Sequence, residues 1–190
     1  MRIRTLHALA LLYGFIVVSN VGAAEKGVHA VHADSAERTV SGGQTQPPVK
    51  FDTIWADDEG ATHIGHCRFE GLQFKSYAPP SAPQWIGVSP DEVESIAYAV
   101  LPPGYVGTWH HAPGPQWVIT LSGKWSVETT DGTTLVQGPG EVQFNADSHS
   151  RPRKDDKRVG HVSRTVGSEP NVQLIIKLKP GVRTTGACAS

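Results

Sequence analysis

Short apolar runs rich in β-branched residues alternate with clusters of turn-forming residues over most of the chain. Runs of this length are typical of strands that bury one or both faces. The one capped helix start, Ser89 to Glu92, precedes a β-branched run and Pro102, which leave room for about one turn. The pattern therefore predicts strands at residues 51–55, 63–74, 95–101, 116–121, 125–129, 134–137, 142–145, 161–166 and 172–178.

Two of the connections have the residues that tight hairpins need. Ser122-Gly123 separates two strand-like runs, and the turn from Thr130 to Thr133 contains Gly132. Glycine fits such turns because it adopts positive φ without strain. Many short strands at even spacing predict an all-β protein, either a sandwich or a barrel. A length of 190 residues suits one such domain.

The first residues have the layout of a secretory signal peptide. Two arginines are followed by the apolar run 8–18 and by the small residues Gly22-Ala23-Ala24. An uncleaved anchor is the alternative, but this run is short, since a membrane-spanning helix needs about 20 apolar residues. We expect a signal peptide at 1–24, a flexible polar leader at 25–49, the barrel at 50–180 and a tail at 181–190, in a secreted or periplasmic protein.

The charge of the chain gives no sign of a polyanionic partner. Removing residues 1–24 takes away two of the 17 basic residues and none of the 18 acidic ones, which leaves 15 against 18 and changes the net charge from −1 to −3. The basic residues between Arg151 and Arg158 are interleaved with Asp155 and Asp156, which is typical of a solvated loop. We therefore expect no nucleic-acid partner and, after signal cleavage, no membrane association.

The chain contains only two cysteines, Cys67 and Cys188. Two thiols in a small exported domain often pair, and a bridge would fix the tail to the body of the protein. We predict this disulfide, with two free thiols as the alternative. Nothing in the spacing indicates a metal–thiolate site.

Two segments resemble the two motifs of the cupin superfamily. Residues 102–123 read PPGYVGTWHHAPGPQWVITLSG, and residues 132–145 contain GPGEV at 138–142. Gln116 stands at the glutamate position of the first motif, and Gly123 at its closing glycine. The resemblance implies a small single-domain cupin, whose fold is an antiparallel double-stranded β-helix, or jelly-roll barrel.

The resemblance also indicates where a metal would bind. Metal-binding cupins use three imidazoles and a carboxylate, and by spacing these positions fall on Trp109, His111, Gln116 and Gln143. Only one of the four is a histidine, tryptophan does not ligate metals, and a neutral amide is a weaker ligand than a carboxylate. The inherited metal site is therefore largely lost in strict register.

A shifted register restores part of the site. His110 and His111 are adjacent, so on a regular strand they face opposite sides, and one of them can point into the barrel. Some small bacterial cupins that look similar carry a Gly-His pair where this chain has Gly160-His161. The candidate metal ligands are thus His110, Gln116 and His161, with His111, Gln143 and Asn145 in reserve. Trp109 and Asn145 are candidate ligand contacts.

These features leave two classes of function open. In the first, the barrel mouth binds a small molecule together with one divalent metal (Fe, Mn, Ni, Cu or Zn), as an oxygenase, isomerase or lyase would. In the second, a metal-free barrel binds or senses a small molecule without catalysis, and its histidines bond to one another or to buried water. A homodimer is compatible with both.

Overall fold

The computed structural model describes residues 45–182, so the predicted signal peptide, most of the leader and Cys188 lie outside the described residues. The described part contains strands and one short 3-10 turn, η1 (Pro90–Glu92), and no helix in it could span a membrane. The strands are β1 (Lys50–Ala56), β2 (Thr62–Arg68), β3 (Gln73–Lys75), β4 (Gln84–Ile86), β5 (Val93–Leu101), β6 (Gln116–Ser122), β7 (Lys124–Thr129), β8 (Thr134–Gln137), β9 (Val142–Ala146), β10 (His161–Val166) and β11 (Asn171–Leu178).

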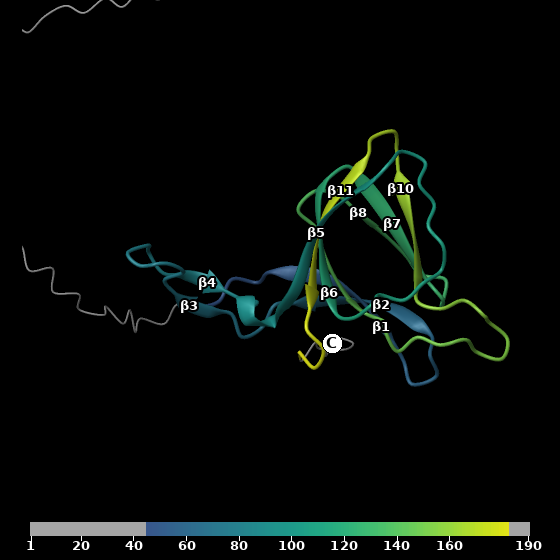
Figure 1. Cartoon of the computed structure of the whole chain (residues 1–190), viewed down its shortest axis with the longest axis horizontal. Helices are drawn as coiled ribbons and strands as arrows, with labels where there is room; N and C mark the ends of the chain where they lie inside the picture. Colours follow the sequence, from purple (N-terminus) through teal and green to yellow (C-terminus); the bar gives the residue numbers. More distant parts are fainter. Residues whose placement is uncertain (1–44, 183–190) are drawn as a thin grey trace, which may run out of the picture. The chain divides into compact units, whose positions relative to one another are not determined.

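The strands form two main sheets (Figure 1). The larger sheet has the order β2-β1-β9-β6-β11-β5, and the smaller has the order β10-β7-β8. A separate two-stranded sheet joins β3 and β4. Pairing between the described strands is antiparallel except for β1 with β9. The predicted all-β fold is confirmed.

Strand positions agree with the hydrophobic pattern, with two exceptions. The run predicted at 63–74 is divided, because the chain leaves β2 at Arg68 and turns at Gly71, where φ is +72°. The three-residue strand β4 was not predicted, since so short a run gives little periodic signal. Both hairpin turns occur as expected, with φ of +67° at Gly123 and +87° at Gly132. Ser89 and Glu92 form the capping box of η1.

The alternation along β6 divides its side chains between two apolar clusters. Val118 points between the two main sheets, where it packs with Ile54, Trp125 and Val127. Trp117 points to the other side, the outer face of the larger sheet. Since neighbouring residues of a strand face opposite ways, the larger sheet is covered on both faces near β1 and β9.

The outer cluster is aromatic. Trp117 stacks on Phe69 with ring centroids 4.8 Å apart, and it also meets Phe51 and Phe144 at 5.0 and 4.5 Å. Trp117 therefore has a packing role, as does Trp125 inside the barrel. Cys67 is buried in the same outer cluster and is disulfide-bonded. Its pairing with Cys188 stays a prediction.

Candidate functional site

One end of the barrel gathers the beginnings of β6 and β10 and the end of β9. Gln116 pairs with Asn145 across β6 and β9, which places both at this end. The loop before β6 meets the start of β10 at this end, because His110 and His161 exchange two backbone hydrogen bonds of 3.0 and 2.8 Å. Residues far apart in the sequence thereby form one rim.

Gly160 makes this close approach possible. Its φ is +64°, and a Cβ at this position would overlap the backbone of His110 and His111. Thr62 Oγ1 donates to the Gly160 carbonyl at 2.5 Å, and the Gly160 N–H donates to Ser150 Oγ at 2.7 Å. The glycine is therefore held from both sides, and His161 begins β10 at a defined position.

His161 forms a buried pair with Asp147. Its Nδ1 lies 2.7 Å from Asp147 Oδ2, and the two residues are 3% and 0% exposed. The other oxygen of Asp147 accepts from the Ala112 N–H at 3.1 Å. A buried carboxylate is costly unless it is paired and hydrogen-bonded, and here both oxygens have a donor. Asp147 fixes the orientation of the His161 ring.

His110 lies directly beside this pair. Its ring centroid is 4.7 Å from that of His161, and its Nδ1 donates to the Thr108 carbonyl at 2.8 Å. Because a carbonyl can only accept, this bond puts the proton on Nδ1 in the neutral ring. Neither His110 Nε2 nor His161 Nε2 has a hydrogen-bond partner within residues 45–182. The mouth thus carries two imidazoles whose oriented Nε2 atoms have no partner among the described residues, one ring exposed (His110) and one buried (His161).

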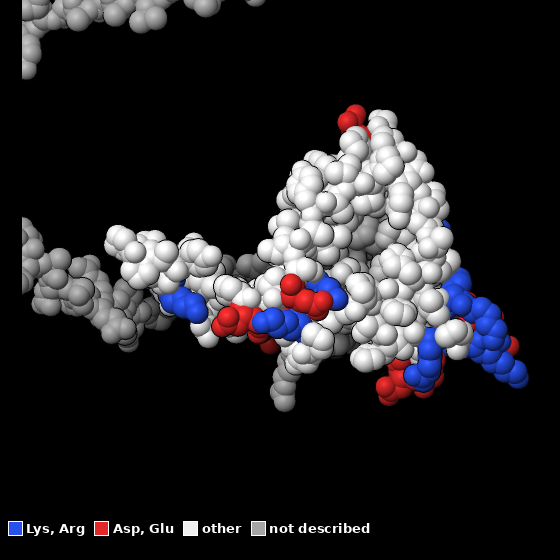
Figure 2. Space-filling view, viewed as in Figure 1, with Lys and Arg blue, Asp and Glu red and all other residues white. Residues whose placement is uncertain are grey.

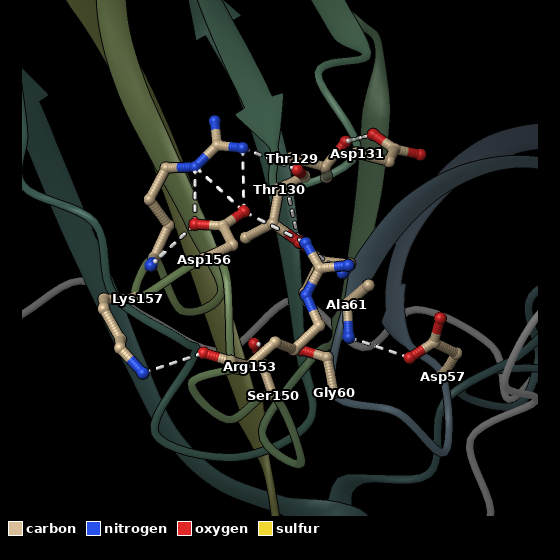
Figure 3. Close-up of polar contacts among 12 residues, drawn as sticks. Asp57, Gly60, Ala61, Thr129, Thr130, Asp131, Ser150, Arg153, Asp156 and Lys157 are labelled. Carbon is tan, nitrogen blue, oxygen red and sulfur yellow. Dashed lines mark hydrogen bonds and ion pairs between the residues drawn. The ribbon is translucent and has the colours of Figure 1, made fainter.

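A charged loop borders the histidine pair. The Arg158 guanidinium lies 4.8 Å from the ring centroid of Trp109, the residue before His110, in a cation–π contact. Arg158 Nε donates to Asp156 Oδ1 at 3.0 Å, and Arg158 Nη2 donates to the Thr130 carbonyl at 2.8 Å. The hydrogen bonds between Arg158 and Asp156 hold the pKa of the Asp156 carboxyl well below its usual range and raise the pKa of Arg158. Arg153 adds a further bond of 3.0 Å to Asp156 (Figure 3).

The remaining candidate residues are placed as follows. Gln143 and Asn145 are fully buried on the interior face of β9, where Gln143 Nε2 donates to Asn145 Oδ1 at 2.6 Å. Gln143 Oε1 is buried without a partner in the described part of the chain. Gln116 is half-buried on the interior face of β6. His111 is exposed, and its Nδ1 bonds to the Ala112 carbonyl at 3.0 Å. Of the predicted ligands, His110 and His161 thus come into direct contact.

The donor set fits a tightly held metal only in part. Within residues 45–182, no group of three or more His, Cys, Asp or Glu side chains is arranged to hold a metal ion. Asp147 already bonds to His161 and to the Ala112 N–H. The site therefore offers two imidazoles, with amide groups from β6 and β9 nearby, rather than the three imidazoles and a carboxylate of a metal-binding cupin.

Sequence reasoning missed Asp147 and Arg158. Both lie in the polar stretch after β9, which reads as a solvated loop because it contains many charges and no period. The available signal for Asp147 was its place just past a buried strand, two residues after Asn145. Nothing local indicated that Arg158 lies over Trp109, because that contact depends on how two long loops fold together.

A two-sheet barrel with an imidazole-bearing mouth is the class that this fold and site define. No protein-family model and no curated protein matches the sequence. Among solved structures, it is similar to a cupin domain from Bordetella pertussis, with 15% identity, a TM-score of 0.33, and coverage of 72% of this chain and 99% of that one. It is also similar to the cupin domain of Schizosaccharomyces pombe Cnp3, with 12% identity and a TM-score of 0.34. That match covers 71% of this chain and 86% of the Cnp3 domain.

A DMSP lyase, DddQ from Ruegeria pomeroyi, is also similar. The identity is 16%, the TM-score is 0.35, and the match covers 52% of this chain. This chain spans 44% of the lyase's length, less than half. These likenesses concern the fold, and the chemistry of the site has to be argued from its own residues.

Proposed function

We propose that this chain binds a small molecule at the barrel mouth, with the Nε2 atoms of His110 and His161 as its hydrogen-bond acceptors. The observation that carries the proposal is that Nδ1 of each ring is held by an oxygen acceptor, Thr108 for one and Asp147 for the other. Each neutral ring is thereby set to accept at Nε2. The Asp147 carboxylate and the His161 ring that it orients are buried, whereas the His110 ring is exposed at the mouth, and this arrangement favours a binding role over packing alone.

The surroundings indicate the chemistry of the ligand. The mouth offers acceptors, since Gln143 Oε1 adds a buried carbonyl, unpaired among the described residues, to the two imidazoles. The nearest cation, Arg158, is already neutralised by Asp156 at 2.9 Å and faced by Glu128 at 3.8 Å. The site therefore suits a neutral molecule that donates hydrogen bonds, such as a polyol, a phenol or an amide.

A probe library tests this proposal. Small neutral polyols, phenols and amides are titrated into the protein with ¹⁵N-labelled histidine, and the imidazole resonances are recorded. Binders are expected to shift His110 and His161 together, and His161→Ala should abolish their binding. His149→Ala is the matched control, because His149 is an exposed histidine of the loop between β9 and β10. Binders that act equally on the wild type and His161→Ala would contradict the proposal.

A divalent metal at the same mouth is the second candidate. It is favoured by the same Nδ1 bonds, because metal-ligating histidines commonly donate their second nitrogen to a carboxylate or a carbonyl. A bound metal would supply Lewis-acid or redox chemistry, with His110, His161 and Gln116 as the residues that would hold it. Equilibrium dialysis against zinc tests the metal, and stoichiometric zinc that is lost in His161→Ala would support this candidate over the first.

Export is part of the proposed function. The signal-peptide pattern of residues 1–24 supports a secreted or periplasmic location. Mass spectrometry of the protein from its native host is expected to show a mature start near Ala24 or Glu25. An intact Met1 would contradict export by cleavage.

A further inference from the structure

The strand β5 forms an unprotected edge of the larger sheet. It is the last strand in the order and pairs with β11 alone within the described part of the chain. Its sequence, VESIAYAVL, contains no Lys, Arg or Pro, the residues that usually protect an edge from pairing with another chain. All five residues from Glu94 to Tyr98 are exposed. An apolar edge of this kind is a template for another strand.

The outer face of β5 is also apolar and uncovered. Ile96, Tyr98 and Val100, here called the β5 stripe, are 64%, 69% and 56% exposed. By register, Tyr98 lies beside Leu174 of β11, which in turn lies beside Ile119 of β6. The stripe therefore continues an apolar surface that reaches the aromatic outer cluster. Exposed apolar patches of this continuity mark interaction surfaces.

Charged side chains are nearly absent from this part of the molecule. On the face drawn in Figure 2, they gather at the lower end, while the upper part, where β5 and β11 are labelled in Figure 1, carries almost none. The nearest ion pair of β5 joins Glu94 to Lys177 at 2.8 Å, at the beginning of the strand. The partner is therefore expected to be apolar at this surface.

The chain's own terminal segments are poor partners for the stripe. Residues 25–44 and 183–190 are mostly polar, and their apolar side chains are small ones, namely valines, alanines and Cys188. Val182, the last described residue, packs against the outer cluster that contains Cys67 of β2. The predicted bridge to Cys67 would direct the tail towards β2, the opposite edge from β5. A second copy of the chain, in contrast, offers an identical edge and an identical stripe.

We propose that two copies form a symmetric dimer in which their β5 strands pair antiparallel across a twofold axis. An interface of this type is self-complementary, because the same surface serves both copies. With the axis at Ala97, Ile96 lies opposite Tyr98 of the partner subunit, and the twofold symmetry repeats this pair. Pairs of an aromatic with a β-branched residue stabilise antiparallel strands. Glu94 then lies opposite Val100 of the partner subunit, which keeps the two Glu94 carboxylates apart.

Sedimentation velocity of the mature chain tests the association. The wild type is expected to be a dimer, and Tyr98→Lys should raise the dissociation constant at least about tenfold, because it buries two ammonium groups near the axis. Val136→Lys is the matched control, since Val136 is a valine of β8 that is 52% exposed. A monomeric wild type, or an equal effect of the two variants, would overturn the proposal.

Cysteine cross-linking tests the strand register. Ala97→Cys is expected to form an intermolecular disulfide under mild oxidation, because the two introduced thiols lie opposite each other at the axis. Val136→Cys should remain uncross-linked under the same conditions. A wild-type dimer whose Ala97→Cys variant does not cross-link would show that the copies meet through another surface, and the proposal would be wrong.

Discussion

At the scale of single residues, the site depends on two residues, Gly160 and Asp147, that do not themselves supply a proposed ligand-binding atom. Gly160 lets the start of β10 meet His110, and Asp147 holds the ring of His161. Neither residue was a candidate from the chemistry of its side chain alone. Gly160 could be recognised through its place beside a histidine, whereas the role of Asp147 became evident only through its burial and its two hydrogen bonds.

The first prediction at this scale concerns Gly160→Ala. The added methyl group would overlap the His110 backbone and would also occupy a positive φ, so the two strand ends should separate. Gly104→Ala is the control, because its φ is +75° with open space around it. We expect urea unfolding to show a loss of about 1 kcal/mol for the control and a larger loss for Gly160→Ala. Equal losses would contradict the close approach.

The second prediction concerns Asp147→Ala. The change leaves the Ala112 N–H and His161 Nδ1 buried without an acceptor, and removing one partner of a buried pair costs about 3 kcal/mol. Asp155→Ala, an exposed position of the following loop, should cost almost nothing. The check is the free energy of unfolding at neutral pH. A small loss for Asp147→Ala would show that the pair is not buried as described.

At the scale of elements, strands were predictable and loop contacts were not. Alternation along β6 is a local property, so the sequence indicated that Gln116 and Val118 share one face of this strand. The sequence also predicted His110, Gln116 and His161 as one set of ligands, and the rings of His110 and His161 lie 4.7 Å apart. Where the ring of His110 lies depends on the long loop between β5 and β6, whose path is set by bonds to β10 that no local pattern encodes.

A polar clamp between loops and strand gives a prediction at this scale. His63 of β2 places Nε2 2.9 Å from Asp57 and Nδ1 2.9 Å from Asp131, in the turns after β1 and β7. Two carboxylates can both accept only from the doubly protonated ring. The hydrogen bond from His63 lowers the pKa of Asp57. Burial alone would raise the pKa of Asp131, but hydrogen bonds from Thr129 and its other donors outweigh this effect, so the pKa of Asp131 is lowered as well (Figure 3).

The sign of the pH dependence follows from these lowered pKa values. A carboxyl whose pKa is lower in the folded state contributes stability above its unfolded pKa of about 3.9, and this stability is lost as the pH falls through the folded value. The difference in unfolding free energy between the wild type and His63→Gln should therefore be larger near pH 5 than near pH 3. His149→Gln is the control, and a difference that grows towards pH 3 would contradict the clamp.

At the scale of the whole molecule, one predicted bridge would link the tail to the barrel. Cys67 is disulfide-bonded, and a bridge to Cys188 would close a loop over most of the folded chain. Loss of such a disulfide typically costs about 2 to 5 kcal/mol. Thiol titration of the denatured, unreduced protein is expected to give no free thiols per chain, and Cys188→Ser should give one and unfold at lower denaturant. Two free thiols in the wild type would contradict the bridge.

The central claim is that His110 and His161 form one site whose Nε2 atoms are available to a ligand. Long-range ¹H–¹⁵N correlation of the histidine rings tests it most directly, because the nitrogen shifts report which atom carries the proton. Both neutral rings are expected to carry the proton on Nδ1, and the two rings are expected to show a direct nuclear Overhauser contact. A proton on Nε2 of either neutral ring, or the absence of any contact between the rings, would contradict it.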